Sequence, residues 1–158
     1  MTWWTAVPSP IQELLLVSDG EHLTRLRFAP FGEPDGVRDD AHHVLHEARR
    51  QLEAYFAAEL THFNLPLRLR GTPFQLDVWQ ALQAIPHGVT RTYGQLAAAL
   101  GLPVGASRAV GLGNNRNPVP VIVPCHRVIG TNGMLTGYGG GLERKRYLLD
   151  LERTGVLF

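Results

Sequence analysis

The sequence predicts a mixed α/β fold of the α+β kind, in which a small antiparallel sheet and one helix precede a mainly helical part. Apolar runs broken by turn residues favour strands over residues 1–30, and Ser18-Asp19-Gly20 is the turn between two of them. Residues 30–38, rich in Pro and Gly, are expected to form a loop. Apolar residues spaced three and four apart then predict a helix that Asp39 or Asp40 caps and that runs to about Leu60.

The second part should consist of short helices whose starts are marked in the sequence. Thr72-Pro73-Phe74-Gln75 and Thr92-Tyr93-Gly94-Gln95 are both capping boxes, and the first has proline at the first helical position. A third short helix, over residues 106–114, follows the break at Gly101-Leu102-Pro103. These last two helices have the outline of a helix-turn-helix, which is also a common packing unit. The first helix should bury Phe74, Val78, Trp79, Leu82 and Ile85.

The charge is divided unevenly along the 158 residues, and we place a domain boundary there, between residues 1–66 and 67–158. The first segment carries five Arg against ten Asp or Glu, whereas the second carries nine Arg and one Lys against four Asp or Glu. A basic second half predicts contact with a polyanion, and arginine is the better ligand for phosphate. Arg108, near the start of the third helix, stands among small residues that would let a backbone approach closely. Taken alone, Arg108 is better explained as a solvated surface arginine.

Membrane and secretory functions are not expected from this composition. No stretch approaches the ~18–20 apolar residues of a membrane span, and the amino terminus lacks the basic and apolar regions of a secretory leader. The chain contains one cysteine, so it forms no internal disulfide, and a reactive thiol survives best in a reducing compartment. We therefore expect a cytoplasmic protein.

That cysteine, Cys125, lies in an apolar segment that reads as a buried strand, Val121-Ile122-Val123-Pro124, and His126 follows it. A free cysteine is most often a small buried hydrophobe, so the pair alone is a weak indication of chemistry. A Gly-rich loop over residues 131–140 has no lysine of the kind found in phosphate-binding loops. A last helix from Leu142 to about Arg153 should place Leu148, Leu149 and Leu151 in the core, with Glu152 near its end.

Six motifs in this order resemble those of the O6-alkylguanine-DNA alkyltransferases, also called methylated-DNA–protein-cysteine methyltransferases. The resemblance covers residues 70–153 without a large gap and the first 65 residues more loosely. It implies a ribonuclease H-like sheet with a packed helix in the first domain, and DNA binding and alkyl transfer in the second. The motifs are Gly71-Thr72-Pro73-Phe74-Gln75, Thr92-Tyr93-Gly94-Gln95-Leu96-Ala97, Ser107-Arg108-Ala109-Val110-Gly111, Asn117-Pro118, Pro124-Cys125-His126-Arg127-Val128 and Thr136-Gly137-Tyr138-Gly139-Gly140-Gly141.

The chemistry that the resemblance implies explains the residue types. Displacement at an alkyl carbon needs a strong nucleophile, and a thiolate is one that is accessible near neutral pH. By resemblance Cys125 accepts the alkyl group once and irreversibly, His126 takes the thiol proton through a water, and Glu152 orients that imidazole. Tyr93 is implied to protonate the leaving guanine, and Asn117 to tie the recognition helix to the active-site strand.

The resemblance also implies how the substrate is held. The main chain of Cys125 and Val128, the Gly139 amide, and the walls Tyr138 and Pro120 would bind the extrahelical guanine. Arg108 would fill the gap that the flipped base leaves, with the helix-turn-helix in the minor groove. The DNA-binding residues implied are Arg108, Ser107, Ala109, Gly111, Tyr93 and Gly94.

The implied partner is double-stranded DNA with O6-alkylguanine, with O4-alkylthymine as a further candidate lesion. The protein is expected to be a monomer in solution, with self-association on DNA left open. Three positions depart from the usual pattern without removing a functional group, namely Ser107, Gly113 and Gly139. His42 and His46 have the one-turn spacing of a metal pair but lack a third ligand nearby, so no metal and no cofactor are expected.

Other functions remain open at this point. A Cys-His-Glu hydrolase would share the three side chains but leave Arg108 and the charge asymmetry unexplained. A helix-turn-helix module that binds DNA or the lesion without transfer would leave Cys125 and His126 idle. An alkyltransferase-like protein that only binds the lesion lacks the reactive cysteine, and a fusion with a cysteine-rich zinc domain would need more cysteines than one.

Overall fold

The computed structural model describes residues 1–133, 135 and 137–154, and the chain divides into two compact units at Leu69 and Arg70. The described residues contain no helix that is both long enough and apolar enough to cross a membrane.

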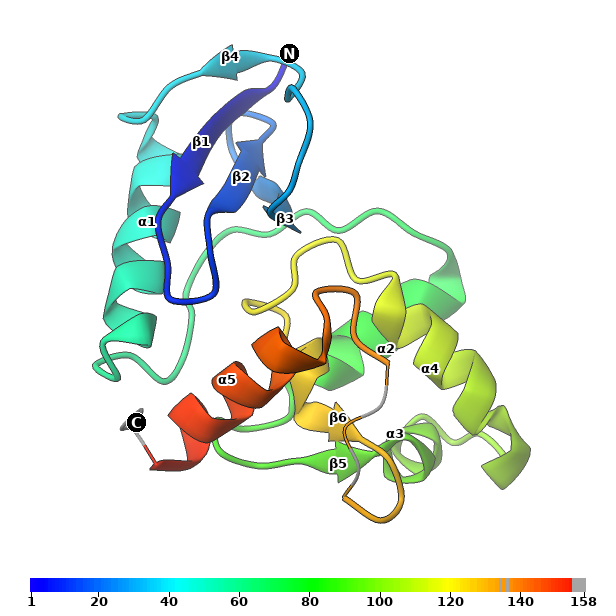
Figure 1. Cartoon of the computed structure of the whole chain (residues 1–158). Coiled ribbons are helices and arrows are strands. Elements are labelled where there is room, and N and C mark those ends of the chain that lie inside the picture. The colour runs from blue at the N-terminus through cyan, green and yellow to red at the C-terminus, as the bar shows by residue number, and fades with distance from the viewer. Residues whose placement is uncertain (134, 136, 155–158) are drawn as a thin grey trace. The chain divides into compact units, whose positions relative to one another are not determined.

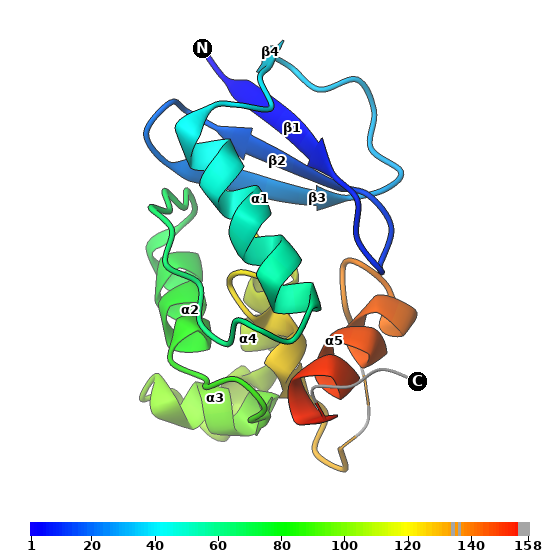
Figure 2. The ribbon, with the colours of Figure 1, turned by 90° about the vertical axis from the view of Figure 1, so that its left-hand side faces the viewer.

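The first unit is a four-stranded sheet with one helix packed on it (Figures 1 and 2). Its strands lie in the order β3-β2-β1-β4. Their bounds, and that of the helix, are β1 (Trp3–Val7), β2 (Leu14–Ser18), β3 (Leu23–Phe28), β4 (Val37–Arg38) and α1 (His43–Phe56). The three long strands pair antiparallel, with Val7 opposite Leu14 and Leu14 opposite Phe28. They form because two turns separate three apolar runs, as the sequence predicted.

The prediction of a loop over residues 30–38 is wrong at its end. There β4 pairs in parallel with β1 and makes the sheet mixed. The Val37 amide donates to the carbonyl of Thr2 at 3.0 Å, and the Asp39 amide donates to that of Trp4 at 2.9 Å. A strand of two residues is too short to show a hydrophobic pattern, so β4 could not be predicted from the sequence. Gly36 reverses the chain just before this strand, with φ +95°.

Helix α1 is shorter at both ends than predicted. Asp39 accepts a hydrogen bond from the Ala41 amide in a turn ahead of the helix, and Asp40 accepts from the hydroxyl of Thr5 and from Arg38. Neither aspartate is therefore the cap, and the helix begins at His43. Past Phe56 the chain turns away through Ala58, which has φ 60°. The predicted apolar stripe is otherwise present, with Val44, Leu45, Ala48, Leu52 and Tyr55 buried.

The second unit is mainly helical and packs four helices around a buried central segment (Figure 1). Its elements are α2 (Pro73–Gln83), β5 (Arg91–Thr92), α3 (Tyr93–Ala99), a 3-10 turn η1 (Val104–Ala106), α4 (Ser107–Asn115), a 3-10 turn η2 (Cys125–Arg127), β6 (Val128–Ile129) and α5 (Leu142–Thr154). Both predicted capping boxes are present, and Thr72 and Thr92 each accept from the amide three residues on. Helix α4 packs against α2 and α3.

Helices α2 and α4 pack against each other at Gly113. Trp79 is buried and donates its indole N–H to the carbonyl of Gly113 at 2.9 Å. A Cβ on Gly113 would lie 3.4 Å from Cγ2 of Val78, so the two helices approach closely here. The prediction for Phe74 was wrong, because its side chain is 36% exposed. Phe74 lies in the first turn of α2, at the edge of the face that buries Val78 and Trp79.

Candidate active site and nucleic-acid interface

The segment before Cys125 is buried but is not the strand that the sequence predicted. Val121 has φ 74°, and the Val123 amide donates back to the carbonyl of Val119 at 2.9 Å, so the chain turns here. The Asn117 side chain holds this turn from both sides, donating to the Val123 carbonyl at 2.7 Å and accepting from the Val119 amide at 3.0 Å. An apolar run cannot distinguish a buried turn from a buried strand, which explains the error.

Cys125 begins the 3-10 turn η2 and is 5% exposed. Its carbonyl accepts from the side chain of Asn114, a buried residue of α4, at 3.4 Å. Asn114 therefore links α4 directly to the cysteine, whereas Asn117 lies just past α4 and holds the preceding turn. The sequence interpretation missed Asn114.

The thiol of Cys125 is held in a site that disfavours its charged form. Burial raises the pKa of Cys125 to about 11, although the side chains of Asn117 and Tyr138 and the charge of Lys145 each lower it. At neutral pH the thiolate is therefore formed only with help from its neighbours. Tyr138 and Asn117 are half-buried, as expected of residues beside a pocket.

His126 and Glu152 form a buried pair next to Cys125. Nε2 of His126 lies 2.6 Å from Oε2 of Glu152, and both side chains are almost completely buried. Burial lowers the pKa of His126, and the carboxylate of Glu152 offsets this only in part, so the imidazole is neutral at pH 7. Because a carboxylate only accepts, Nε2 carries the proton. Nδ1, which makes no hydrogen bond with the described residues, is then the acceptor.

Arg127 completes this buried hydrogen-bond network, a role that the sequence did not indicate. Its Nε donates to Oε1 of Glu152 at 2.7 Å, and its Nη2 donates to Oε2 at 3.0 Å. Its Nη1 donates to the carbonyl of Ile85 at 2.6 Å. Burial opposes the charge of Glu152, but the hydrogen bonds and charges of His126 and Arg127 outweigh it and hold the pKa of Glu152 well below its usual range.

Lys145 is the second cation that the sequence interpretation missed. It is fully buried on α5. Helical spacing places it one turn from Leu148, which was predicted to be buried, so the spacing agrees with its burial. Burial lowers the pKa of Lys145 to about 8, while the charge of Cys125 acts to raise it. The periodicity of α5 could have revealed it, because Lys145, Leu148 and Glu152 share one face.

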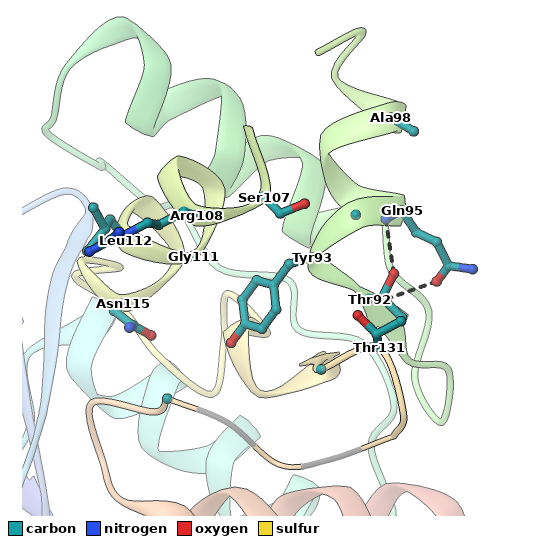
Figure 3. A pocket seen from close by; sticks show the side chains of 13 residues that line it. Thr92, Tyr93, Gln95, Ala98, Ser107, Arg108, Gly111, Leu112, Asn115 and Thr131 are labelled. Atoms are coloured by element: carbon teal, nitrogen blue, oxygen red, sulfur yellow. Dashed lines mark hydrogen bonds between the residues drawn. The ribbon is translucent and has the colours of Figure 1, made fainter. Parts of the chain in front are cut away.

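An open groove of about 790 Å³ is lined mainly by α3 and α4, the two helices of the predicted helix-turn-helix (Figure 3). The Tyr93 ring, at the first position of α3, lies between the side of α4 and Thr131, and the Thr92 capping box opens the helix beside it. A Cβ on Gly111 would lie 3.6 Å from Cε1 of Tyr93, so the absence of a side chain on Gly111 leaves room beside the ring.

The predicted DNA-binding residues gather around this groove. Arg108 is exposed on α4, and Leu112, one turn further on, is 61% exposed. Tyr93, Gly94, Ser107, Arg108 and Gly111 all line the groove, whereas Ala109 is exposed on α4 and does not line it. A Cβ on Gly94 would lie 3.8 Å from Oγ of Ser107, so small residues bring α3 and α4 together here.

The predicted substrate-binding residues lie on two segments. Pro120 and Val128 are buried on either side of Cys125, and Tyr138 and exposed Gly139 lie on the loop before α5. A Cβ on Gly137, which has φ +44°, would lie 3.4 Å from Nδ2 of Asn115, so this loop passes close to the end of α4. Met134 and Thr136, which belong to the predicted Gly-rich loop, lie outside the described residues.

No group of three or more His, Cys, Asp or Glu side chains that could hold a metal ion occurs among the residues described. The ring of His42 stacks between Trp3 and His43, at centroid distances of 5.3 and 4.7 Å. This stacking supports a packing role for His42 in the first unit.

A buried cysteine beside a His–Glu pair, in one unit with a helix-turn-helix, defines a class of protein with a nucleophile next to a nucleic-acid-binding motif. Two family models cover nearly the whole chain. The ribonuclease-like domain of 6-O-methylguanine DNA methyltransferase matches residues 3–69, and the DNA binding domain of the same family matches residues 73–154. The chain therefore belongs to the 6-O-methylguanine DNA methyltransferase family, and the resemblance drawn from the six motifs is confirmed.

Individual relatives are similar over almost their full length. The methylated-DNA–protein-cysteine methyltransferase of Mycobacterium leprae is 53% identical, over 96% of this chain and 93% of that protein. That of Methanosarcina acetivorans is 51% identical, over 95% of this chain and 97% of the relative. Among solved structures, Mycobacterium tuberculosis OGT in complex with DNA is 50% identical with a TM-score of 0.89, over 96% of this chain and 93% of that one.

Proposed function

We propose that this protein repairs DNA by transferring an alkyl group from guanine O6 to Cys125 in a reaction that each molecule performs once. The observation that carries the proposal is the buried pair of His126 and Glu152, because His126 directly follows the chain's one cysteine. Family membership and the DNA-bound relative support DNA as the partner. The substrate we propose is duplex DNA with O6-alkylguanine, with O4-alkylthymine as a second lesion.

The proton of Cys125 goes to Nδ1 of His126, through a water as in the family that the chain resembles. Glu152 stabilises the imidazolium that forms, through the hydrogen bond at 2.6 Å. The thiolate then attacks the alkyl carbon, an S–C bond forms and the C–O6 bond breaks. The electron pair moves into the guanine, and Tyr93 supplies the proton that lets the base leave neutral. The thioether has no route to hydrolysis, so the protein is consumed.

The groove between α3 and α4 is the surface that we assign to DNA. Arg108 is exposed on this surface and takes the place of the flipped base, while the small residues beside it suit the narrow minor groove. Gly94, Ser107, Ala109 and Gly111 contribute backbone and small side chains to this contact. The extrahelical guanine is read by the main chain of Cys125 and Val128 and by the Gly139 amide, between Tyr138 and Pro120.

The two units have different parts in this proposal. DNA binding and alkyl transfer belong to the second domain (residues 67–158), and the first domain (residues 1–66) carries no reacting group. The single cysteine, which must stay reduced to react, favours the cytoplasm as its location. We propose a monomer in solution, with self-association only on DNA.

The decisive experiment incubates the protein with a stoichiometric amount of duplex DNA containing O6-methylguanine and then measures the protein's mass. We expect the gain of one methyl group on Cys125 and none on Cys125→Ser, which should still bind the DNA. A serine variant that accepts the methyl group would contradict the mechanism. Turnover of a thioester or ester substrate without stable modification would favour a hydrolase, and tight binding without modification would favour a DNA-binding module.

A further inference from the structure

Leu112 is a large apolar side chain that the fold leaves in water and that the proposed function does not yet use. It is 61% exposed, more than any other large apolar residue in the helices that the structure describes. It lines the groove of Figure 3 together with Arg108 and Asn115. Single exposed leucines are common on protein surfaces, so its exposure alone indicates nothing.

The place of Leu112 on α4 is what sets it apart. The buried side of the helix consists of Val110, Gly113 and Asn114. On the exposed side, Arg108 stands one turn before Leu112 and Arg116 one turn after it, and α4 contains no acidic residue. An apolar side chain between two arginines matches a groove of DNA, where phosphates border the sugars and base edges.

The spacing on α4 indicates which part of the DNA would face Leu112. Residues four apart in an α-helix lie about 6 Å apart along its axis, and successive base pairs lie about 3.4 Å apart. With Arg108 in the gap left by the flipped base and α4 along the groove, Leu112 lies against the base pair about two steps away. An A·T pair presents only acceptors in the minor groove, whereas a G·C pair adds the 2-amino group of guanine.

We propose that Leu112 makes repair depend on the base pair about two steps from the lesion. Its side chain fits against an A·T pair, but against a G·C pair it covers the 2-amino group and leaves this donor without water or an acceptor. The inference rests on the proposed function and adds sequence context to it. Arg108 holds the flipped state in any sequence, and Leu112 distinguishes one surrounding sequence from another.

An apolar contact also has its own salt dependence. A phosphate contact releases counterions, so its loss reduces the slope of log affinity against log salt concentration by about one. The contribution of Leu112 comes from apolar surface removed from water and releases no counterion. Removing this side chain should therefore weaken binding without changing the slope.

The first test uses duplexes with O6-methylguanine that differ only in the pair two steps away, on either side of the lesion. That pair is A·T, G·C, or inosine paired with cytosine, which lacks the 2-amino group. On one side of the lesion, single-turnover repair by the wild-type protein should be about fivefold or more slower with G·C than with the other two pairs. Leu112→Ala should repair all three at nearly equal rates. A wild-type protein without this preference, or a Leu112→Ala protein that keeps it, would overturn the proposal.

Two matched variants control for the substitution. Leu76→Ala removes another exposed leucine, from α2, that does not line the groove, and it should keep the wild-type preference. Leu112→Met keeps an apolar side chain of similar size and should keep most of the preference. Thermal unfolding should be unchanged in all three variants, since each side chain is exposed. Loss of the preference in Leu76→Ala would show that it does not come from the groove and would overturn the proposal.

The second test measures binding without transfer, in a Cys125→Ser background, on an unmodified duplex of A·T pairs. Adding Leu112→Ala should weaken binding about fivefold, as for partial burial of one apolar side chain, with the salt slope unchanged. A slope reduced by about one would assign the loss to a phosphate contact and overturn the proposal. Failure of the wild-type protein to accept a methyl group from any duplex would instead contradict the proposed function. Transfer at equal rates from all duplexes would leave that function standing and remove only the role of Leu112.

Discussion

The two units of this protein place their charges in opposite ways. In the first unit the arginine–carboxylate pairs are on the surface: Arg49 and Glu53, 3.2 Å apart, have side chains 33% and 59% exposed. Its buried polar residues are neutral, namely Thr5, Ser18 and Gln51. In the second unit the pairs around Glu152 are almost fully enclosed, with side-chain exposures of 1% for Glu152 and 8% for Arg127.

This difference indicates that the exposed pairs of the first unit matter little for folding, whereas the enclosed charges of the second unit serve the proposed chemistry. Exposed pairs contribute little to folding, and burying a charge pair often costs more in desolvation than its attraction returns. The first unit needs no buried charge to fold, so its core is apolar. The second unit encloses four ionisable residues, namely His126, Arg127, Lys145 and Glu152, and the proton transfer that we propose needs fixed charges at short range.

The largest effect should follow from breaking the enclosed pair. Glu152→Gln leaves Arg127 buried without a negative partner, and we expect the free energy of unfolding to fall by about 3–5 kcal/mol. Alkyl transfer should also slow, because His126 loses the carboxylate that stabilises its imidazolium. Urea unfolding measures the first effect. Adding Arg127→Met should recover much of the stability but not the transfer rate; equal recovery of both would contradict the assigned role of Glu152.

Arg108→Ala tests an exposed charge of the second unit that folding should not need. Thermal unfolding should be unchanged, while repair of duplex DNA should fall about tenfold or more, because a few kcal/mol oppose flipping of the base. Reaction with free O6-benzylguanine, which needs no flipping, should be nearly unaffected. Single-turnover rates on the two substrates make the comparison. Equal losses on both substrates would indicate a damaged pocket. A similar loss of affinity on all DNA, with the slope of log affinity against log salt concentration reduced by about one, would indicate a phosphate contact.

Alkylation of Cys125 should lower the free energy of unfolding by less than Glu152→Gln does. An added methyl group in a close-packed site typically costs about 1–3 kcal/mol, and here it lies next to the hydrogen bonds of Asn114 and Asn117. The spent protein should melt several degrees lower and be cut faster by protease. Cys125→Ser treated in the same way is the control. A melting temperature that stays equal or rises after complete alkylation would mean that the pocket accepts the group without strain.

The smallest effect should come from the first unit. Glu53→Gln removes the partner of Arg49 on the surface of α1, and such one-turn helix pairs contribute about 0.3–0.5 kcal/mol. Urea unfolding and the rate of alkyl transfer should both be almost unchanged. A loss comparable to that of Glu152→Gln would show that exposure does not separate the two kinds of pair in this protein.

Local signatures in the sequence predicted the elements that depend on local interactions. The two capping boxes at Thr72 and Thr92 fixed the starts of α2 and α3, because each needs only residues three apart. Features that depend on distant partners were missed or misplaced. Strand β4 exists only because β1 lies beside it, and Asp40 is no helix cap because Thr5 and Arg38 take its carboxylate.

The same distinction holds for the candidate site. Cys125, His126 and Glu152 carry functional groups that suggest chemistry from their type alone. Asn114 and Arg127 gain their importance only from where the fold places them. Lys145 was a different case, since the spacing of α5 indicated burial, but a lysine is assigned to the surface by default.

The short pairing of β5 with β6 has a consequence for the whole reaction. Arg91 pairs with Val128 and Thr92 with Ile129, so the two residues before Tyr93 are joined to the two residues after the Cys125 turn. The proposed proton donor and the nucleophile are thus held in one rigid frame before any nucleic acid arrives. The orientational entropy of bringing them together is already lost when the chain folds. DNA has only to deliver the base, so a free modified guanine should meet a site that is already assembled.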